Sequence, residues 1–194
     1  KVHPGMKIRS LAYQAEMFFP GKRSDHNQTK TLECDVLIIG AGPAGMSAAT
    51  QLAETGNTVV VADERSEPGG QFFKQLASSY SFTNNKFSDS QYRDGAVLIE
   101  RLLRTDAQVI GNANVWGAFR DKAGNIEICM DVEKTSYIVR PRQLILATGA
   151  FESVPAFPGW TLPGVMATGA AQSLVRAYRV SPGQKILIAG NGPL

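Results

Sequence analysis

The sequence lacks the residue patterns that build metal sites and disulfides. Its 194 residues include two cysteines, Cys34 and Cys129, and two histidines. The cysteines stand far apart without a Cys-x-x-Cys motif, and neither histidine has a second ligand at metal spacing. No metal site and no local redox pair is therefore predicted. Both cysteines are instead expected to be small buried apolar residues.

Long apolar runs and a strong charge of one sign are also absent. No apolar run approaches the roughly 18 residues that span a bilayer, and the N-terminal residues lack the apolar segment of a signal peptide. The net charge of +3 is mild and the basic residues are scattered, which argues against nucleic-acid binding. We expect a cytoplasmic globular protein, long enough for one domain with a sizeable core and for parts of a second.

A short apolar run that breaks into glycines is the most informative stretch. Residues 36–39 are aliphatic without polar alternation, as in a strand covered on both faces. Gly40 allows a tight turn, Gly42 lets the backbone approach a pyrophosphate, and Gly45 lets a following helix pack closely on the strand. Pro43 suits the first turn of that helix, whose unpaired N–H groups would face the phosphates. The pattern predicts a dinucleotide-binding turn.

An acidic pair follows the glycines at the distance that such a site requires. Residues 58–62 are predicted to form a second strand, which ends in Asp63 and Glu64 about 20 residues further on. A carboxylate at this place accepts hydrogen bonds from ribose hydroxyls. Glycine-rich turns are common in other α/β proteins, but the full set of strand, three glycines, helix, strand and acidic end favours the dinucleotide site.

The loop after the acidic pair contains two more glycines. It includes the segment Glu67-Pro-Gly-Gly70-Gln71, which alone would indicate an ordinary Pro-Gly loop. If the two strands are neighbours, this segment lies close to the first glycine turn. It is then better explained as a second stretch of backbone, a backbone wall, along the bound dinucleotide.

The remaining pattern predicts an α/β domain, a Rossmann-like parallel sheet with an inserted antiparallel β-meander. Residues 20–30 indicate a linker, and residues 78–91 an irregular excursion. The other predicted elements are a helix at 92–104, meander strands at 107–112, 113–120, 126–132 and 137–142 with a hairpin turn at 121–125, a buried parallel strand at 144–150, a helix at 168–178 and a strand at 185–189. The last strand leads into Gly190 and Gly192, which repeat the first two glycines of the opening motif.

Several motifs together carry a family resemblance. Gly40-Ala-Gly-Pro-Ala-Gly45, Glu67-Pro-Gly-Gly-Gln71 and Ala147-Thr-Gly149 resemble those of flavoproteins with two dinucleotide-binding domains, the class of the pyridine nucleotide-disulfide oxidoreductases. Phe157-Pro-Gly-Trp-Thr-Leu-Pro-Gly-Val-Met166 and the run into Gly190-Asn-Gly-Pro-Leu194 are similar to a narrower group. That group comprises the α-type subunits of hydrogen cyanide synthase, opine oxidase, dye-linked proline dehydrogenase and sarcosine oxidase. The resemblance covers roughly residues 33–194.

The resemblance implies a glutathione-reductase-like FAD domain in truncated form. Residues 1–33 would be an N-terminal extension and linker, and His3-Pro-Gly-Met-Lys-Ile resembles the closing strand of an upstream [2Fe–2S] ferredoxin-like domain. Residues 34–156 would be the FAD-binding Rossmann-like domain, and residues 157–194 the start of an NAD(P)-binding domain. The sequence is therefore expected to be part of a longer protein.

The resemblance also assigns cofactors to residues. FAD is implied at the first site, where the glycine loop would hold the pyrophosphate, the acidic pair the ribose and the backbone of one meander residue the adenine. The implied contacts are Gly40, Gly42, Pro43, Ala44, Gly45, Asp63, Glu64, Gly70, Gln71, Val115, Ala147, Thr148 and Gly149. Gly190 and Gly192 would belong to a second, truncated site for NAD(P). In the sarcosine oxidase relatives the corresponding subunit is associated with NAD, which is the alternative occupant of the first site.

The predicted function is that of a flavin-dependent oxidoreductase within a hetero-oligomeric amine or amino-acid dehydrogenase or oxidase. The flavin performs the electron transfer while the protein supplies binding and orientation. No catalytic acid, base or nucleophile is identified. No redox cysteine pair follows Gly70, which excludes disulfide exchange by this segment. The alternatives are a non-catalytic dinucleotide-binding scaffold subunit of such a complex and a flavin monooxygenase.

Overall fold

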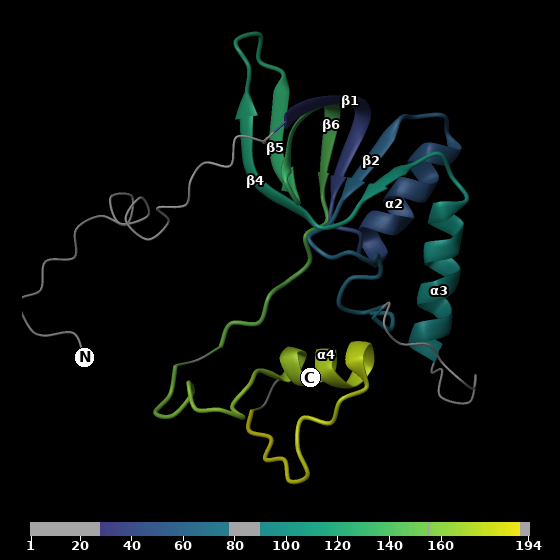
Figure 1. The fold of residues 1–194 in the computed structure, drawn as a ribbon. Helices are drawn as coiled ribbons and strands as arrows, with labels where there is room; N and C mark the ends of the chain where they lie inside the picture. The colour runs from purple at the N-terminus through teal and green to yellow at the C-terminus, as the bar shows by residue number, and fades with distance from the viewer. Residues whose placement is uncertain (1–27, 78–89, 155, 191–194) are drawn as a thin grey trace, which may run out of the picture.

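A six-stranded sheet forms the centre of the described part of the chain (Figure 1). The computed structural model describes residues 28–77, 90–154 and 156–190. Its strands follow the order β3-β2-β1-β6-β5-β4 across the sheet. The elements are β1 (Gln28–Ile39), α2 (Pro43–Glu54), β2 (Val59–Ala62), α3 (Ser90–Leu103), β3 (Gln108–Ile110), β4 (Ala113–Arg120), β5 (Ile126–Val132), β6 (Thr135–Leu146) and α4 (Thr168–Tyr178).

The parallel half of the sheet contains the expected buried strand. β1 pairs in parallel with β2 and with β6, and β2 pairs in parallel with β3. Val36 and Ile38 pack with residues of α2 and α3 on one face. Leu37 packs on the other face with residues of β4, β5 and β6. All three side chains are buried, so the run lacks polar alternation because both of its faces are covered. The predicted α/β class is confirmed.

β1 and β6 are longer than the sequence pattern suggests. They pair from Gln28 and Thr135 to Ile39 and Leu146, so residues 28–33 are strand rather than linker. The two strands expected at 137–142 and 144–150 are one continuous strand. Pro141 lies within it, where the missing N–H is tolerated because β5 pairs with β6 only as far as Val139.

The antiparallel meander consists of β4, β5 and the first half of β6. The strand predicted at 107–112 is not part of it, because β3 pairs in parallel with β2 at the far edge of the sheet. The hairpin turn expected at 121–125 is present: the carboxylate of Asp121 accepts the N–H groups of Ala123 and Asn125 at 2.8 and 2.9 Å. The meander covers one face of the parallel strands, and the helices cover the other (Figure 1).

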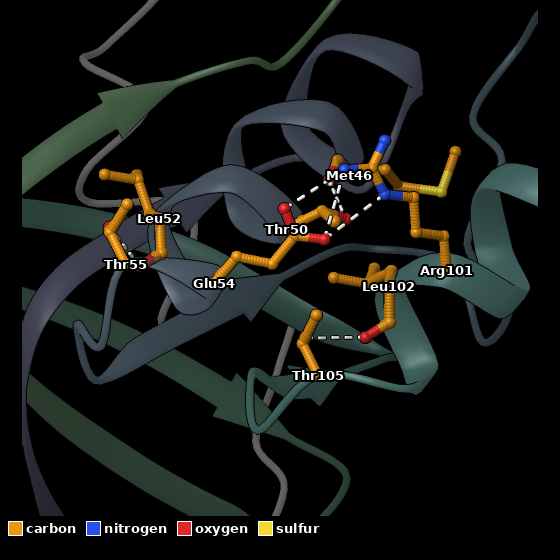
Figure 2. A network of polar contacts seen from close by, with 8 residues as sticks. All are labelled: Met46, Thr50, Leu52, Glu54, Thr55, Arg101, Leu102 and Thr105. Carbon is orange, nitrogen blue, oxygen red and sulfur yellow. Dashed lines mark hydrogen bonds and ion pairs between the residues drawn. The ribbon is translucent and has the colours of Figure 1, made fainter.

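Helices α2 and α3 lie side by side and hold each other in place. Leu102 of α3 and Met46 of α2 are both fully buried in the core cluster on the helix-covered face. Figure 2 shows the polar contacts around this packing, including the ion pair of Arg101 with Glu54 at 3.0 Å. The hydroxyl of Thr50 donates to the carbonyl of Met46 at 2.9 Å within α2. Since α2 starts at the glycine turn, this packing also fixes the direction of its N-terminus.

The last part of the chain differs from its prediction. Helix α4 has the bounds expected from the sequence, but residues 185–189 form no strand. Ile186, Leu187 and Ile188 are 60%, 93% and 81% exposed. A strand buried on two faces needs neighbouring strands to pair its backbone and helices to cover it, and the described residues provide neither here. Among them, no helix is both long enough and apolar enough to cross a membrane.

Candidate dinucleotide-binding site

The glycine turn after β1 lies against the end of β6. Gly40 has a φ of +106°, which favours glycine, and its N–H donates to the carbonyl of Ala62 at 2.8 Å. A Cβ on Gly40 would lie 2.2 Å from the carbonyl oxygen of Ala147. Ala147 in turn donates its N–H to Ile39 at 2.8 Å. The turn and the Ala147-Thr-Gly149 segment therefore meet at the carboxyl ends of neighbouring parallel strands, where α/β sheets bind ligands.

The two later glycines of the motif have different surroundings. A Cβ on Gly45 would lie 1.8 Å from the carbonyl oxygen of Gly40, so only glycine allows α2 to pack this closely on the turn. Gly42 is the N-cap of α2, and no side chain caps the helix there. Pro43 occupies its first turn, and this turn leaves backbone N–H groups available for an anion.

A second backbone wall faces Gly42, as the sequence predicted. Gly69 donates its N–H to the carbonyl of Ala41 at 2.8 Å. A Cβ on Gly70 would lie 2.8 Å from the Cα of Gly42, and Gly70 has a φ of +61°. A Cβ on Gly42 would meet only the Cα of Gly70, at 3.9 Å. The position of Gly42 thus opens into a space that the protein itself leaves free, which suits the close approach of a pyrophosphate.

The two acidic residues after β2 have different surroundings: Asp63 is hydrogen-bonded to backbone, and Glu64 is exposed. The carboxylate of Asp63 accepts the N–H of Ala41 at 2.5 Å and the N–H of Arg65 at 2.8 Å. It therefore ties the glycine turn to the loop after β2. Glu64 is exposed at the same strand end. Of the two residues predicted to contact a ribose, Glu64 has the carboxylate that faces solvent.

The remaining predicted contacts are distributed around this edge. Thr148, Gly149 and Gln71 are exposed, and Val115 is half-buried in β4. β4 begins beside the acidic pair, because Ala113 donates its N–H to the carbonyl of Asp63 at 2.8 Å.

The predicted second dinucleotide site, at Gly190 and Gly192, is not formed by the described residues. Gly190 is exposed, and a Cβ built on it would have no atom within 4 Å. Gly192 lies outside the described residues.

The glycine motif did not show that the backbones of two further residues, Ala41 and Gly69, hold the turn together. Ala41 both donates to Asp63 and accepts from Gly69, and Gly69 has a φ of +127°. Neither position offers a side chain whose chemistry could have marked it. The flanking glycines were the only signal, and they located the segment without showing which atoms pair.

Both cysteines are free thiols in strands of the sheet. Cys34 is buried in β1 and Cys129 lies in β5, and neither forms a disulfide. Burial, supported by the nearby charge of Asp35, raises the pKa of the Cys34 thiol to about 11. Among the described residues, no group of His, Cys, Asp and Glu could hold a metal ion. The described residues of the site offer backbone and carboxylate contacts for a nucleotide.

Residues 34–194 match the family described as pyridine nucleotide-disulphide oxidoreductase. The chain belongs to this family. An opine oxidase subunit of Agrobacterium tumefaciens is 37% identical over 165 residues, which are 82% of this chain and 32% of that protein. Hydrogen cyanide synthase subunit HcnB of Pseudomonas aeruginosa is 34% identical, with 81% of this chain and 33% of that protein covered. The resemblance predicted from the motifs is confirmed.

The fold is also that of a solved structure. The crystal structure of L-proline dehydrogenase from P. horikoshii matches with a TM-score of 0.68 at 24% identity, over 82% of this chain and 31% of that chain. This chain spans about a third of the length of the opine oxidase and hydrogen cyanide synthase subunits. The family to which the chain belongs is one of FAD/NAD(P)-binding flavoproteins. The glycine turn, the helix N-terminus and the Gly69–Gly70 wall fit such a dinucleotide.

Proposed function

We propose that residues 34–156 bind FAD and that the whole protein is a flavin-dependent oxidoreductase. The observation that carries the proposal is the space at Gly42, bounded by the uncapped N-terminus of α2 and by Gly70. Anions bind at such helix ends because the N–H groups and the helix dipole both favour negative charge. When bound, FAD supplies the electron transfer, and the residues of this chain bind and orient it.

Each predicted contact has a role in this proposal. Gly40, Gly42, Pro43, Ala44 and Gly45 hold the pyrophosphate, and Glu64 accepts hydrogen bonds from the ribose. Asp63 contributes by positioning the glycine turn. The other proposed contacts are Gly70 and Gln71 toward the flavin, Val115 toward the adenine, and Ala147, Thr148 and Gly149 over the pyrophosphate.

The rest of the proposal concerns the whole protein. Residues 157–194 begin an NAD(P)-binding domain, of which Gly190 and Gly192 form part. The substrate is an amine or amino acid, and the chain works in a hetero-oligomeric complex in the cytoplasm. Support comes from the names of similar proteins, which are subunits of opine oxidase, hydrogen cyanide synthase and sarcosine oxidase.

A single methyl group tests the binding site. Gly42 has a φ of −75° and nothing within ordinary contact distance except Gly70, so Gly42→Ala should fold normally. Its methyl would occupy the space for the pyrophosphate and weaken FAD binding by at least about 10-fold, equivalent to about 1.4 kcal/mol. Isothermal calorimetry of the full-length protein measures the affinity, and Gly183→Ala, at an exposed position outside any helix or strand, is the control. Equal FAD affinity in Gly42→Ala and wild type would refute the proposed site.

A scaffold subunit that binds a dinucleotide without catalysis is the second candidate. It uses the same binding site and differs from the first candidate in that the bound dinucleotide transfers no electrons. An anaerobic titration separates the two functions: the flavin absorbance of the full-length protein is followed during addition of NADH and then of proline or sarcosine. Bleaching by an amine supports the oxidoreductase, whereas a bound but redox-silent nucleotide supports the scaffold.

A further inference from the structure

The loop that carries the backbone wall is held at both of its ends. At its start, Gly69 donates its N–H to the carbonyl of Ala41 in the glycine turn at 2.8 Å. At its other end, Ala77 donates its N–H to the carbonyl of Ala177 in α4 at 3.0 Å. Residues 69–77, the wall loop, therefore join the proposed FAD site to a helix that lies away from the sheet (Figure 1).

A buried lysine makes a second contact between the wall loop and α4. Lys74 is 5% exposed, and its Nζ donates to the Oγ of Ser173 at 2.6 Å. Ser173 in turn donates its hydroxyl proton to the carbonyl of Gly169, one turn earlier in α4, at 2.9 Å. A buried ammonium group needs hydrogen bonds inside the protein because it has lost those to water. Ser173 therefore fixes the place where the ammonium group of Lys74 stays buried.

The backbone connects Lys74 to the wall itself. Its neighbour Phe73 donates its N–H to the carbonyl of Gly69 at 3.0 Å. A Cβ on Gly69 would lie 3.7 Å from the backbone nitrogen of Lys74, so the chain folds back on itself within this turn. Gly70 follows directly, and a Cβ on Gly70 would lie 2.8 Å from the Cα of Gly42. A displacement of Lys74 is therefore expected to move the wall that bounds the space at Gly42.

Helix α3 contacts both α4 and the wall loop. The hydroxyl of Tyr92, a residue that is 3% exposed, donates to the carbonyl of Arg176. The guanidinium group of Arg176 lies 4.4 Å from the ring centre of Tyr92. A Cβ on Gly95, further along α3, would lie 2.7 Å from the Cβ of Phe73. Each of the three segments thus contacts the other two, which gives α4 a defined position against the wall loop.

We propose that α4 is a supporting element of the first dinucleotide site, with Ser173 and Lys74 as positioning residues for FAD binding. This inference rests on the proposed function. Ser173 holds the ammonium group of Lys74, Lys74 holds the wall loop, and the wall loop sets the width of the space at Gly42. Helix α4 lies in residues 157–194, which the sequence assigns to a second domain, so the inference couples that segment to the first site.

Ser173→Ala removes the contact and leaves the helix intact. Alanine has the highest helix propensity, and a serine hydroxyl bonded to the carbonyl four residues earlier slightly destabilises a helix, so α4 should keep its structure. Lys74 loses its buried acceptor, and the wall loop should move. In the full-length protein we expect FAD binding to be about 10-fold weaker than in the wild type by isothermal calorimetry.

Two further serine variants serve as controls. Ser173→Thr keeps the hydroxyl group and should bind FAD as the wild type does. Ser181→Ala removes an exposed hydroxyl whose hydrogen bond, to the carbonyl of Gly183 at 2.8 Å, is local. It should also leave FAD affinity unchanged.

Hydrogen exchange in the nucleotide-free full-length protein separates this role from general stability. The amide protons of Gly69 and Phe73 form the hydrogen bonds at the start of the wall loop. In Ser173→Ala, mass spectrometry should show about 10-fold faster exchange in peptides that span residues 69–77. Peptides from the centre of β1, around the fully buried Leu37, should exchange as in the wild type.

The inference requires both changes, so unchanged FAD affinity or unchanged exchange of the wall loop in Ser173→Ala overturns it. Equally faster exchange along the whole chain also overturns it, since Ser173 would then act only through the stability of the fold. A wild-type protein that binds no FAD refutes the proposed function. Faster exchange confined to the wall loop would in that case still support its coupling to α4.

Discussion

At the residue scale, the two neighbouring carboxylates after β2 have different partners. Asp63 accepts two backbone N–H groups, whereas Glu64 is exposed. Replacing Asp63 with Asn puts an amide donor where an acceptor is needed, so we expect a loss of about 1 to 3 kcal/mol in the free energy of unfolding. Glu64→Gln should change it by less than about 0.5 kcal/mol. Urea denaturation measures both, and equal stabilities would show that Asp63 does not organise the turn.

Substitutions of Asp63 and Glu64 should affect different properties, protein stability in one case and FAD binding in the other. In the proposed site Glu64 contacts the ribose, so Glu64→Gln should weaken FAD binding although it leaves the fold unchanged. The sequence identified both residues by their spacing from the glycines. It could not divide their roles, because the division depends on which carboxylate the folded loop turns toward Ala41.

Cys34 illustrates how burial controls a thiol. With a pKa of about 11, only about one thiol in a thousand is ionised at pH 8, against roughly one in four for a free cysteine. Reaction with Ellman's reagent at pH 8 should therefore be about 100-fold slower in the folded protein than in urea. A Cys129→Ser background isolates the signal, and equally fast reaction in both states would contradict the buried position. Because the folded pKa lies above the unfolded value of about 8.5, this thiol's contribution to stability is complete below pH 8.5 and is lost as the pH rises toward 11.

At the element scale, α3 contains a buried and an exposed leucine in succession. Leu102 is fully buried against α2, and Leu103 is 63% exposed. Leu102→Ala should cost about 2 to 5 kcal/mol because it leaves a cavity, and Leu103→Ala less than about 0.5 kcal/mol. Thermal and urea denaturation of the pair test the packing. Similar losses would show that α3 does not cover the sheet as described.

The strands show where a local pattern is insufficient. Residues 135–146 form one strand, although the sequence predicted two. The first half of this strand pairs with β5 and β1, and its second half pairs with β1 alone. Because the neighbouring strands differ between the two halves, the pattern of buried and exposed residues changes within β6. Helix α4 and the hairpin turn at 121–125 were predictable because the contacts that define them are local.

At the scale of the whole molecule, an apolar segment lies exposed near the end of the described chain. Ile186, Leu187 and Ile188 are all more than half exposed in the described part of the chain, and exposed apolar side chains bind hydrophobic dyes. Replacing Ile186 and Ile188 with Ser should lower the fluorescence of the dye ANS bound to residues 1–194 and leave the free energy of unfolding unchanged. An equal ANS signal would place the apolar surface elsewhere, and a loss of stability would mean that the two side chains are buried.

The sequence by itself determined the glycine turn, the acidic strand end and the family. Each depends on local requirements: a positive φ at Gly40, the start of a helix after Gly42, and a strand of fixed length before Asp63. Only the tertiary structure decided that Gly70 faces Gly42 and that Lys74 meets Ser173, 99 residues away. The physical reason is that these contacts join segments without any shared periodicity. Their formation depends on the packing of the sheet and helices that bring them together.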